Sequence, residues 1–152
     1  MACALMWGAS VGFGAPPDGP QDISFQAKVD GTVQKYIEWL PPAFDAAATN
    51  DVLLALHGHG SDRWQFIKDA RDECRGVREV AARFKLILVS PDYRAATSWM
   101  GPKAEADVLQ IIAELKQRHK IGRIFLAGAS MGGTGVLTFA ALHPEVIAGV
   151  CS

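Results

Sequence analysis

The chain of 152 residues is long enough for one domain with a hydrophobic core. Its content of 49% hydrophobic and 20% charged residues describes a globular protein and excludes a disordered one. A net charge of −1 gives no reason to expect nucleic acid or an anionic membrane surface as a partner. The three cysteines, Cys3, Cys74 and Cys151, indicate neither a disulfide framework nor a metal site, and Cys151 is expected to be a small core residue.

Residues 1–22 are expected to be a leader and linker that precede the folded domain. Residues 1–15 are apolar but lack the basic start of a secretory signal, and the prolines and glycine of residues 15–22 oppose regular structure. If these residues are the remnant of a signal segment, they favour a secreted or periplasmic protein. If they are a plain leader, they favour a cytoplasmic protein, so the sequence leaves the cellular compartment undetermined. No apolar run in the sequence reaches the length of a membrane span.

The first half of the folded part has the pattern of strands. Residues 23–29 and 32–40 are predicted to form a hairpin that turns at Asp30-Gly31, a strong short-range hairpin signal. After a loop, the continuous apolar run of residues 51–56 is typical of a strand buried on both faces. This run ends at the glycine- and histidine-rich residues 57–61.

From there the chain alternates between predicted helices and strands. A helical region carries one apolar stripe, formed by Val77, Val80, Ala81 and Phe84. Residues 85–90, 121–127 and 146–151 are predicted strands, and residues 102–119 and 131–143 are predicted helices, the first with Val108, Ile111, Ile112 and Leu115 on its core face. Such alternation predicts an α/β fold with a mostly parallel, doubly wound sheet.

The sequence Gly128-Ala129-Ser130-Met131-Gly132 lies between the predicted strand at 121–127 and the helix that follows. G-x-S-x-G between a strand and a helix is the pattern of a nucleophile elbow, a tight turn that presents a serine hydroxyl at the end of the sheet. The glycines leave room where side chains would collide. The backbone N–H of Met131, at the helix N-terminus, is expected to point to where an oxyanion would form.

Together with Leu56-His57-Gly58-His59-Gly60 after the earlier strand, this motif makes residues 26–152 resemble the α/β-hydrolases, in particular the esterase-like and prolyl-oligopeptidase-like serine hydrolases. The resemblance implies Ser130 as the catalytic nucleophile and carboxylic esters, before peptides or thioesters, as substrates. It also implies an oxyanion hole formed by Met131 and by His59 or Gly60. His57 would brace the loop and would not be the catalytic base, and no cofactor or metal is expected.

The segment from Asp92 to Gly101 follows the end of a predicted strand, where ligands bind in open α/β sheets. Tyr93, Trp99 and Met100 are therefore candidates for a substrate pocket, and ordinary loop packing explains them equally well.

The resemblance leaves the acid and the base of the catalytic triad unassigned. In the family these residues follow the serine along the chain, the acid before the histidine. The only histidine after Ser130 is His143, at the far end of a predicted helix and about 18 Å away. The predicted last strand, residues 146–151, also lacks any charge or proline that would protect a sheet edge. We therefore expect residues 23–152 to be the N-terminal portion of a hydrolase domain truncated after the sixth strand, with the acid and base beyond it and little or no activity alone.

Two other functions stay open at this stage. A complete protein of this length would be a non-catalytic binding module or pseudoenzyme on the hydrolase fold. A metallohydrolase would use His57 and His59 with Asp62 nearby, but the sequence offers no further ligand cluster. The oligomeric state is not determined by the sequence.

Overall fold

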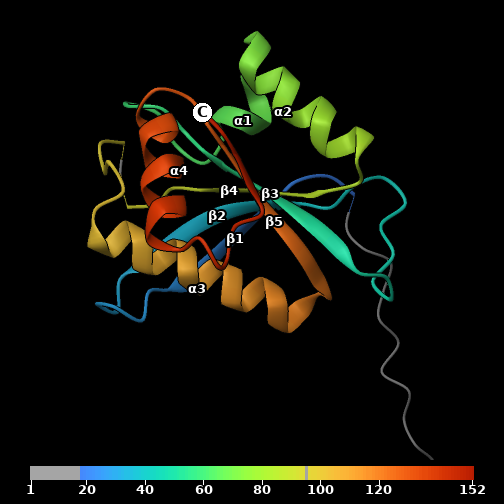
Figure 1. Ribbon diagram of the computed structural model, residues 1–152, viewed down its shortest axis with the longest axis horizontal. Coiled ribbons are helices and arrows are strands. Elements are labelled where there is room, and N and C mark those ends of the chain that lie inside the picture. The colour runs from blue at the N-terminus through green and yellow to red at the C-terminus, as the bar shows by residue number, and fades with distance from the viewer. Residues whose placement is uncertain (1–17, 95) are drawn as a thin grey trace, which may run out of the picture.

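The computed structural model describes residues 18–94 and 96–152 (Figure 1). The expectations for residues 1–17, including the signal remnant and Cys3, lie outside this part of the chain. The described residues form a six-stranded sheet with the strand order β1-β2-β4-β3-β5-β6. The elements are β1 (Gln21–Gln26), β2 (Val33–Trp39), β3 (Asn50–Leu56), α1 (Gln65–Lys68), α2 (Asp72–Arg83), β4 (Ile87–Pro91), α3 (Pro102–Arg118), β5 (Ile121–Gly128), α4 (Met131–Leu142) and β6 (Gly149–Cys151).

The predicted hairpin is present as the antiparallel pair β1–β2, which joins the sheet through antiparallel pairing of β2 with β4. Strand β1 begins at Gln21, inside the segment predicted to be linker, and ends at Gln26. The turn is longer than predicted, because the N–H of Ala27 already donates to the carbonyl of Thr32 at 2.8 Å. The hairpin therefore places Asp30 and Thr32 on an extended loop beyond the ends of its strands.

Strands β4, β3, β5 and β6 are parallel neighbours, which confirms the predicted mostly parallel sheet. Strand β6 is shorter than predicted, because the chain first makes a turn in which the N–H of Val146 donates to the carbonyl of His143 at 3.0 Å. Cys151 is exposed, so the prediction of a core cysteine was wrong. Among the described strands β6 pairs with β5 alone, and this edge position leaves Cys151 without the cover that a central strand would have.

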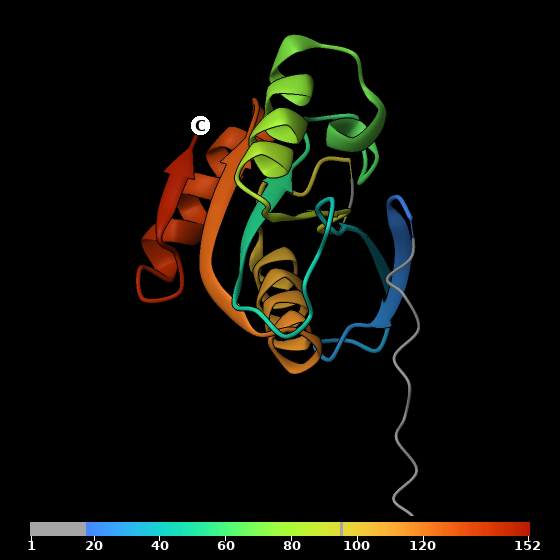
Figure 2. The same cartoon turned by 90° about the vertical axis from the view of Figure 1, so that its right-hand side faces the viewer.

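The two faces of β3 pack against different helices, as alternation of side chains along a strand requires. Val52, Leu54 and Leu56 join the core beneath α3 and α4, whereas Leu53 and Ala55 join the core beneath α1 and α2. Figures 1 and 2 show the resulting layers, with α1 and α2 on one side of the strands and α3 on the other. The core face predicted for α3 is confirmed, since Val108, Ile111, Ile112 and Leu115 are all at most 4% exposed.

The apolar stripe predicted on α2 is only partly covered. Ala81 is buried, but Val80 and Phe84 are 43% and 62% exposed. These two side chains border an apolar groove of about 540 Å³ between α2 and the edge of the sheet, to which Phe125 and Val150 also contribute. The stripe fails to become core because no described element lies over this end of β5 and β6.

The carboxyl ends of β4, β3 and β5 lie at the same edge of the sheet, since the three strands are parallel neighbours. Each is followed by an irregular segment: the β4–α3 loop (residues 92–101), the β3–α1 loop (residues 57–64) and the turn at Ser130. The fold thus brings all the segments that carry predicted site residues to one edge. No helix in the described part of the chain is both long and apolar enough to cross a bilayer.

Candidate active site

Ser130 lies between the last residue of β5 and the first residue of α4, and its side chain is exposed. Its backbone has φ 56° and ψ −119°, a conformation that residues with a side chain rarely adopt. Backbone strain of this kind clusters at functional sites, where the surrounding structure holds it. The strained backbone expected of a serine at a nucleophile elbow is therefore present in this turn.

Close backbone packing holds the turn in place. A Cβ atom added at Gly132 would overlap the carbonyl group of Leu56, and one added at Gly128 would overlap the carbonyl of Gly132. Only glycine allows α4 to approach the end of β3 so closely. The first turn of α4 and Ser130 are thereby fixed against the start of the β3–α1 loop.

The β3–α1 loop runs directly beside Ser130. A Cβ built on Gly58 would lie 3.8 Å from the Cβ of Ser130. The N–H of Gly58 donates to the side-chain oxygen of Gln65 at 2.8 Å, and the N–H of Gly60 donates to the carbonyl of Ala96 at 2.8 Å. His59, between them, has a backbone N–H with no acceptor among residues 18–94 and 96–152. Of the two residues predicted as alternatives for the donor in this loop, only His59 has a backbone N–H without an acceptor in the described residues.

The second expected donor is the N–H of Met131, the first residue of α4. It also has no acceptor within the described residues, whereas the next N–H, of Gly132, donates to the carbonyl of Ala129 at 2.9 Å. Free N–H groups at a helix N-terminus carry partial positive charge and favour an anion. The side chain of Met131 is fully buried, which fixes the start of the helix.

His57 has the environment of a bracing residue. It is fully buried, with Nδ1 2.8 Å from the carbonyl oxygen of Gly58 and Nε2 3.2 Å from that of Asp92. The hydroxyl of Tyr93 donates to the His57 carbonyl at 2.6 Å, and the two rings lie 4.6 Å apart. Both ring nitrogens thus face backbone oxygens, which is unsuited to metal binding. The described residues contain no cluster of three or more His, Cys, Asp or Glu that could hold a metal ion.

The three pocket candidates lie in different environments. Tyr93 and Met100 are 2% and 4% exposed and belong to the hydrophobic core, and burial raises the pKa of Tyr93. Trp99 is 52% exposed, and its ring lies 6.3 Å from that of His59, which is also exposed. Of the three candidates, only Trp99 is exposed, whereas Tyr93 and Met100 are packed in the core.

An ion-pair bridge that the sequence did not reveal connects the two loops to the hairpin. Arg63 forms ion pairs with Asp92 at 3.0 Å and with Asp22 of β1 at 2.8 Å. The hydrogen bond from Arg63 holds the pKa of Asp22 below its ordinary value. No local sequence pattern predicts this bridge, because Arg63 is 29 residues from Asp92 and 41 residues from Asp22 in the chain.

The other two histidines are engaged away from Ser130. His119 contacts the buried carboxylate of Glu38 at 2.9 Å, and His143 contacts Glu105 at 2.8 Å. A second apolar groove of about 550 Å³ lies between α2 and the segment after β2, and no residue of the Ser130 turn lines it. The contacts of these two histidines and the second groove therefore do not contribute to the arrangement around Ser130.

Comparison with known proteins identifies the fold. The sequence model described as the alpha/beta hydrolase fold matches residues 53–145, and no curated protein matches the chain. Among solved structures, a thermostable esterase is similar with TM-score 0.72 and 22% identity, covering 88% of this chain and 40% of its own. A fluorophosphonate-binding serine hydrolase of Staphylococcus aureus has TM-score 0.66 and 22% identity, covering 89% and 56%.

A ferulic acid esterase from the anaerobic fungus Anaeromyces mucronatus has TM-score 0.67 and 21% identity, covering 90% of this chain and 60% of its own. At such identities the likeness shows the fold alone. The chain spans 40% to 60% of the length of these three structures. Because the family match covers more than half of the chain and includes both the β3–α1 loop and the Ser130 turn, the protein belongs to the α/β-hydrolase fold family.

Proposed function

We propose that the protein is part of a serine hydrolase that cleaves carboxylic esters through an acyl-enzyme on Ser130. The observation that carries the proposal is the exposed serine in a strained backbone conformation, next to two backbone N–H groups that have no acceptor in the described part of the chain. Several proteins of similar fold are named esterases or serine hydrolases, which agrees with this chemistry.

In the proposed reaction, the Ser130 hydroxyl oxygen attacks the ester carbonyl carbon while a general base takes the hydroxyl proton. The carbonyl oxygen becomes an oxyanion that accepts hydrogen bonds from the N–H groups of His59 and Met131. One donor of this kind typically lowers the barrier by about 3–4 kcal/mol. The intermediate collapses, the alcohol leaves with the proton, and water then hydrolyses the acyl group from Ser130.

In this proposal, no side chain of residues 18–94 and 96–152 acts as the general base. Of the chain's four histidines, only His59 is on the same edge of the sheet with an exposed ring. His59 belongs to the oxyanion loop, and an imidazole there would lie beside the oxyanion rather than where the hydroxyl proton leaves. We therefore propose that the acid and the base lie outside this chain and that residues 23–152 form the N-terminal portion of the hydrolase domain. The groove beside β6, over which no element of the described residues lies, supports this proposal.

A fluorophosphonate probe and an activated p-nitrophenyl ester, each with and without added imidazole, test the proposal. We expect slow labelling of the chain at Ser130, turnover near background, and faster labelling when imidazole supplies the missing base. The Ser130→Ala variant removes the nucleophile and is expected to show no labelling under either condition.

The outcomes separate the alternatives. Equal labelling of Ser130→Ala would show that Ser130 is not the nucleophile. Absence of labelling even with imidazole would favour a non-catalytic binding module. Rapid turnover without imidazole would show that the chain carries its own base, against the proposal that the base lies elsewhere.

A further inference from the structure

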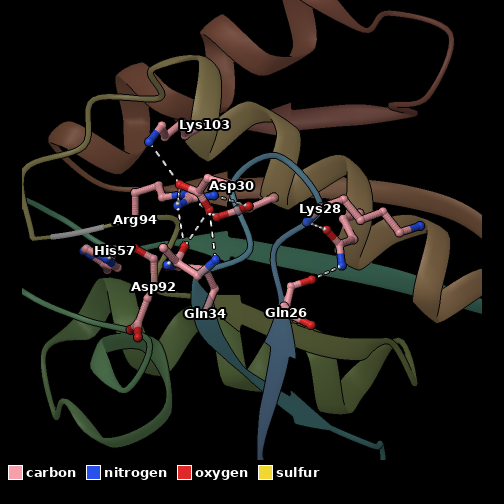
Figure 3. Close-up of polar contacts among 11 residues, drawn as sticks. Gln26, Lys28, Asp30, Gln34, His57, Asp92, Arg94 and Lys103 are labelled. Carbon is pink, nitrogen blue, oxygen red and sulfur yellow. Dashed lines mark hydrogen bonds and ion pairs between the residues drawn. The ribbon is translucent and has the colours of Figure 1, made fainter.

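Arg94 connects its own segment, the β4–α3 loop, to helix α3 and to the turn of the β1–β2 hairpin (Figure 3). Its guanidinium donates to the carboxylate of Asp107 on α3 at 2.8 Å, with Nε 2.6 Å from the second carboxylate oxygen. It also donates to Asp30 at 2.9 Å and to the Thr32 hydroxyl at 3.0 Å, both in the turn of the β1–β2 hairpin. We call Arg94, Asp107, Asp30 and Thr32 the Arg94 cluster.

The cluster is more enclosed than a surface ion pair. The Asp107 side chain is 2% exposed and the Arg94 side chain 14% exposed. A planar guanidinium is suited to such a site, because its fixed donors can reach several acceptors at once. Between the two side chains, Arg94 Nε and Asp107 Oδ2 form an ion pair without hydrogen-bond geometry, and the hydrogen bond runs to the other carboxylate oxygen. The exposed Lys103 adds only an outer contact to Asp30 at 3.0 Å.

The loop that the cluster holds has a strained backbone. Tyr93 and Arg94 have φ values of 32° and 91°, and Trp99 and Met100 have φ values of 51° and 55°. Each such residue with a side chain raises the free energy of the loop, so the conformation persists only where surrounding contacts determine it. Arg94 supplies those contacts at the first strained pair, and the burial of Met100 supplies them at the second.

The loop in turn contacts the site. Two residues after Arg94, the carbonyl of Ala96 accepts the N–H of Gly60 at 2.8 Å. This bond engages the N–H of Gly60 and leaves that of His59 as the free donor beside Ser130. A shift of the β4–α3 loop that broke this bond would therefore leave the Gly60 N–H without its acceptor, next to the N–H of His59.

We propose that Arg94 is a positioning residue: through Asp107 and Asp30 it fixes the β4–α3 loop, and through the Ala96–Gly60 hydrogen bond it sets the oxyanion donor at His59. The role of the donor rests on the proposed function, whereas the structural coupling from Arg94 to Gly60 does not.

Amide hydrogen exchange measured by NMR tests the coupling without any activity. Arg94→Lys keeps the charge but cannot reach Asp107 and the hairpin turn from separate nitrogens, and it is expected to accelerate exchange of the Gly60 N–H on the order of 10-fold. A second variant, Arg94→Met with Asp107→Leu, removes both charges, so that no buried carboxylate is left unpaired. It is expected to give the same or a larger acceleration at Gly60.

The control is Arg118→Lys, because Arg118 also bonds a buried carboxylate, Glu38, at 2.6 Å, but from the end of α3 away from the site. It should leave Gly60 exchange unchanged. The amide of Ile111 in the core of α3 serves as the internal reference in all variants. Acceleration of Gly60 and Ile111 by the same factor would indicate general destabilisation and would overturn the proposal, as would unchanged Gly60 exchange in both Arg94 variants.

Fluorophosphonate labelling in the presence of imidazole gives the second measurement. If Ser130 is the nucleophile, both Arg94 variants should be labelled on the order of 10-fold more slowly, and Arg118→Lys at the unchanged rate. If the unaltered chain is not labelled at all, the proposed function fails, and the exchange experiment still decides whether Arg94 positions Gly60.

Discussion

The backbone of Gly132 lies against the carbonyl group of Leu56, so closely that no side chain fits between α4 and the end of β3. This contact fixes the helix that carries the N–H of Met131 directly beside Ser130. We expect Gly132→Ala to lower the free energy of unfolding by about 1–3 kcal/mol, because the added methyl group must displace the backbone of the neighbouring strand end. Urea unfolding, followed by circular dichroism, measures the change.

A matched glycine provides the control. Gly76 lies within α2, and a Cβ added there would meet no atom within 4 Å. Gly76→Ala should stabilise the protein by about 0.5–1 kcal/mol, because alanine loses less conformational entropy in a helix. Equal effects of the two substitutions would contradict the close packing at Gly132.

The strain at Ser130 predicts that its replacement will not weaken the fold. The Ser130 side chain makes no hydrogen bond to the N-terminal N–H groups of α4, so Ser130→Ala should leave the melting temperature nearly unchanged. Ser130→Gly should raise the free energy of unfolding by about 1 kcal/mol, because glycine adopts a positive φ without strain. If Ser130→Gly instead lowered the free energy of unfolding, the positive φ at Ser130 would contribute little strain energy to the folded state. Differential scanning calorimetry of both variants makes the comparison.

The acid side of the stability profile should depend on Asp30. Its hydrogen bonds from Thr32, Lys103 and Arg94 hold the pKa of its carboxyl well below the ordinary value of 3.8. A carboxyl whose pKa is lower in the folded than in the unfolded chain contributes stability above the ordinary pKa and loses it as pH falls. The free energy of unfolding should therefore decrease between roughly pH 5 and pH 2.

Asp30→Asn should make that decrease shallower, because the unfolded state of the variant no longer gains a proton at this position. Part of the slope should remain, since Asp22, Asp51 and Asp69 also have lowered pKa values. Urea unfolding at a series of pH values measures this slope of the free energy of unfolding against pH. An unchanged slope in Asp30→Asn would show that the Asp30 contacts do not persist in solution.

The exposure of the apolar stripe on α2 predicts unequal effects of two phenylalanine substitutions. Phe84 is 62% exposed, so Phe84→Ser should change the free energy of unfolding by less than about 0.5 kcal/mol. Phe139 of α4 is fully buried, and Phe139→Ala should cost about 3–5 kcal/mol. A large loss of stability in Phe84→Ser, measured by urea unfolding, would show that the groove beside β6 is covered in the isolated chain.

The sequence alone determined the elements and the main motif, because both depend on residues a few positions apart. The continuous apolar run at 51–56 predicted a buried central strand, and the spacing of Val108, Ile111, Ile112 and Leu115 predicted the buried face of α3. The glycines around Ser130 likewise predicted a tight turn between a strand and a helix, which lies between β5 and α4.

Only the tertiary structure decided which groups at the site are free and which are engaged. That the Gly60 N–H is bonded and the His59 N–H is not depends on Ala96, which belongs to another loop. The partners of Arg63 and Arg94 include residues of a distant strand and hairpin turn. Cys151 is exposed because β6 is an edge strand, and Phe84, after α2, is exposed beside that edge. Such contacts link segments that are far apart in the sequence, and they exist only once the order of the strands has brought those segments together.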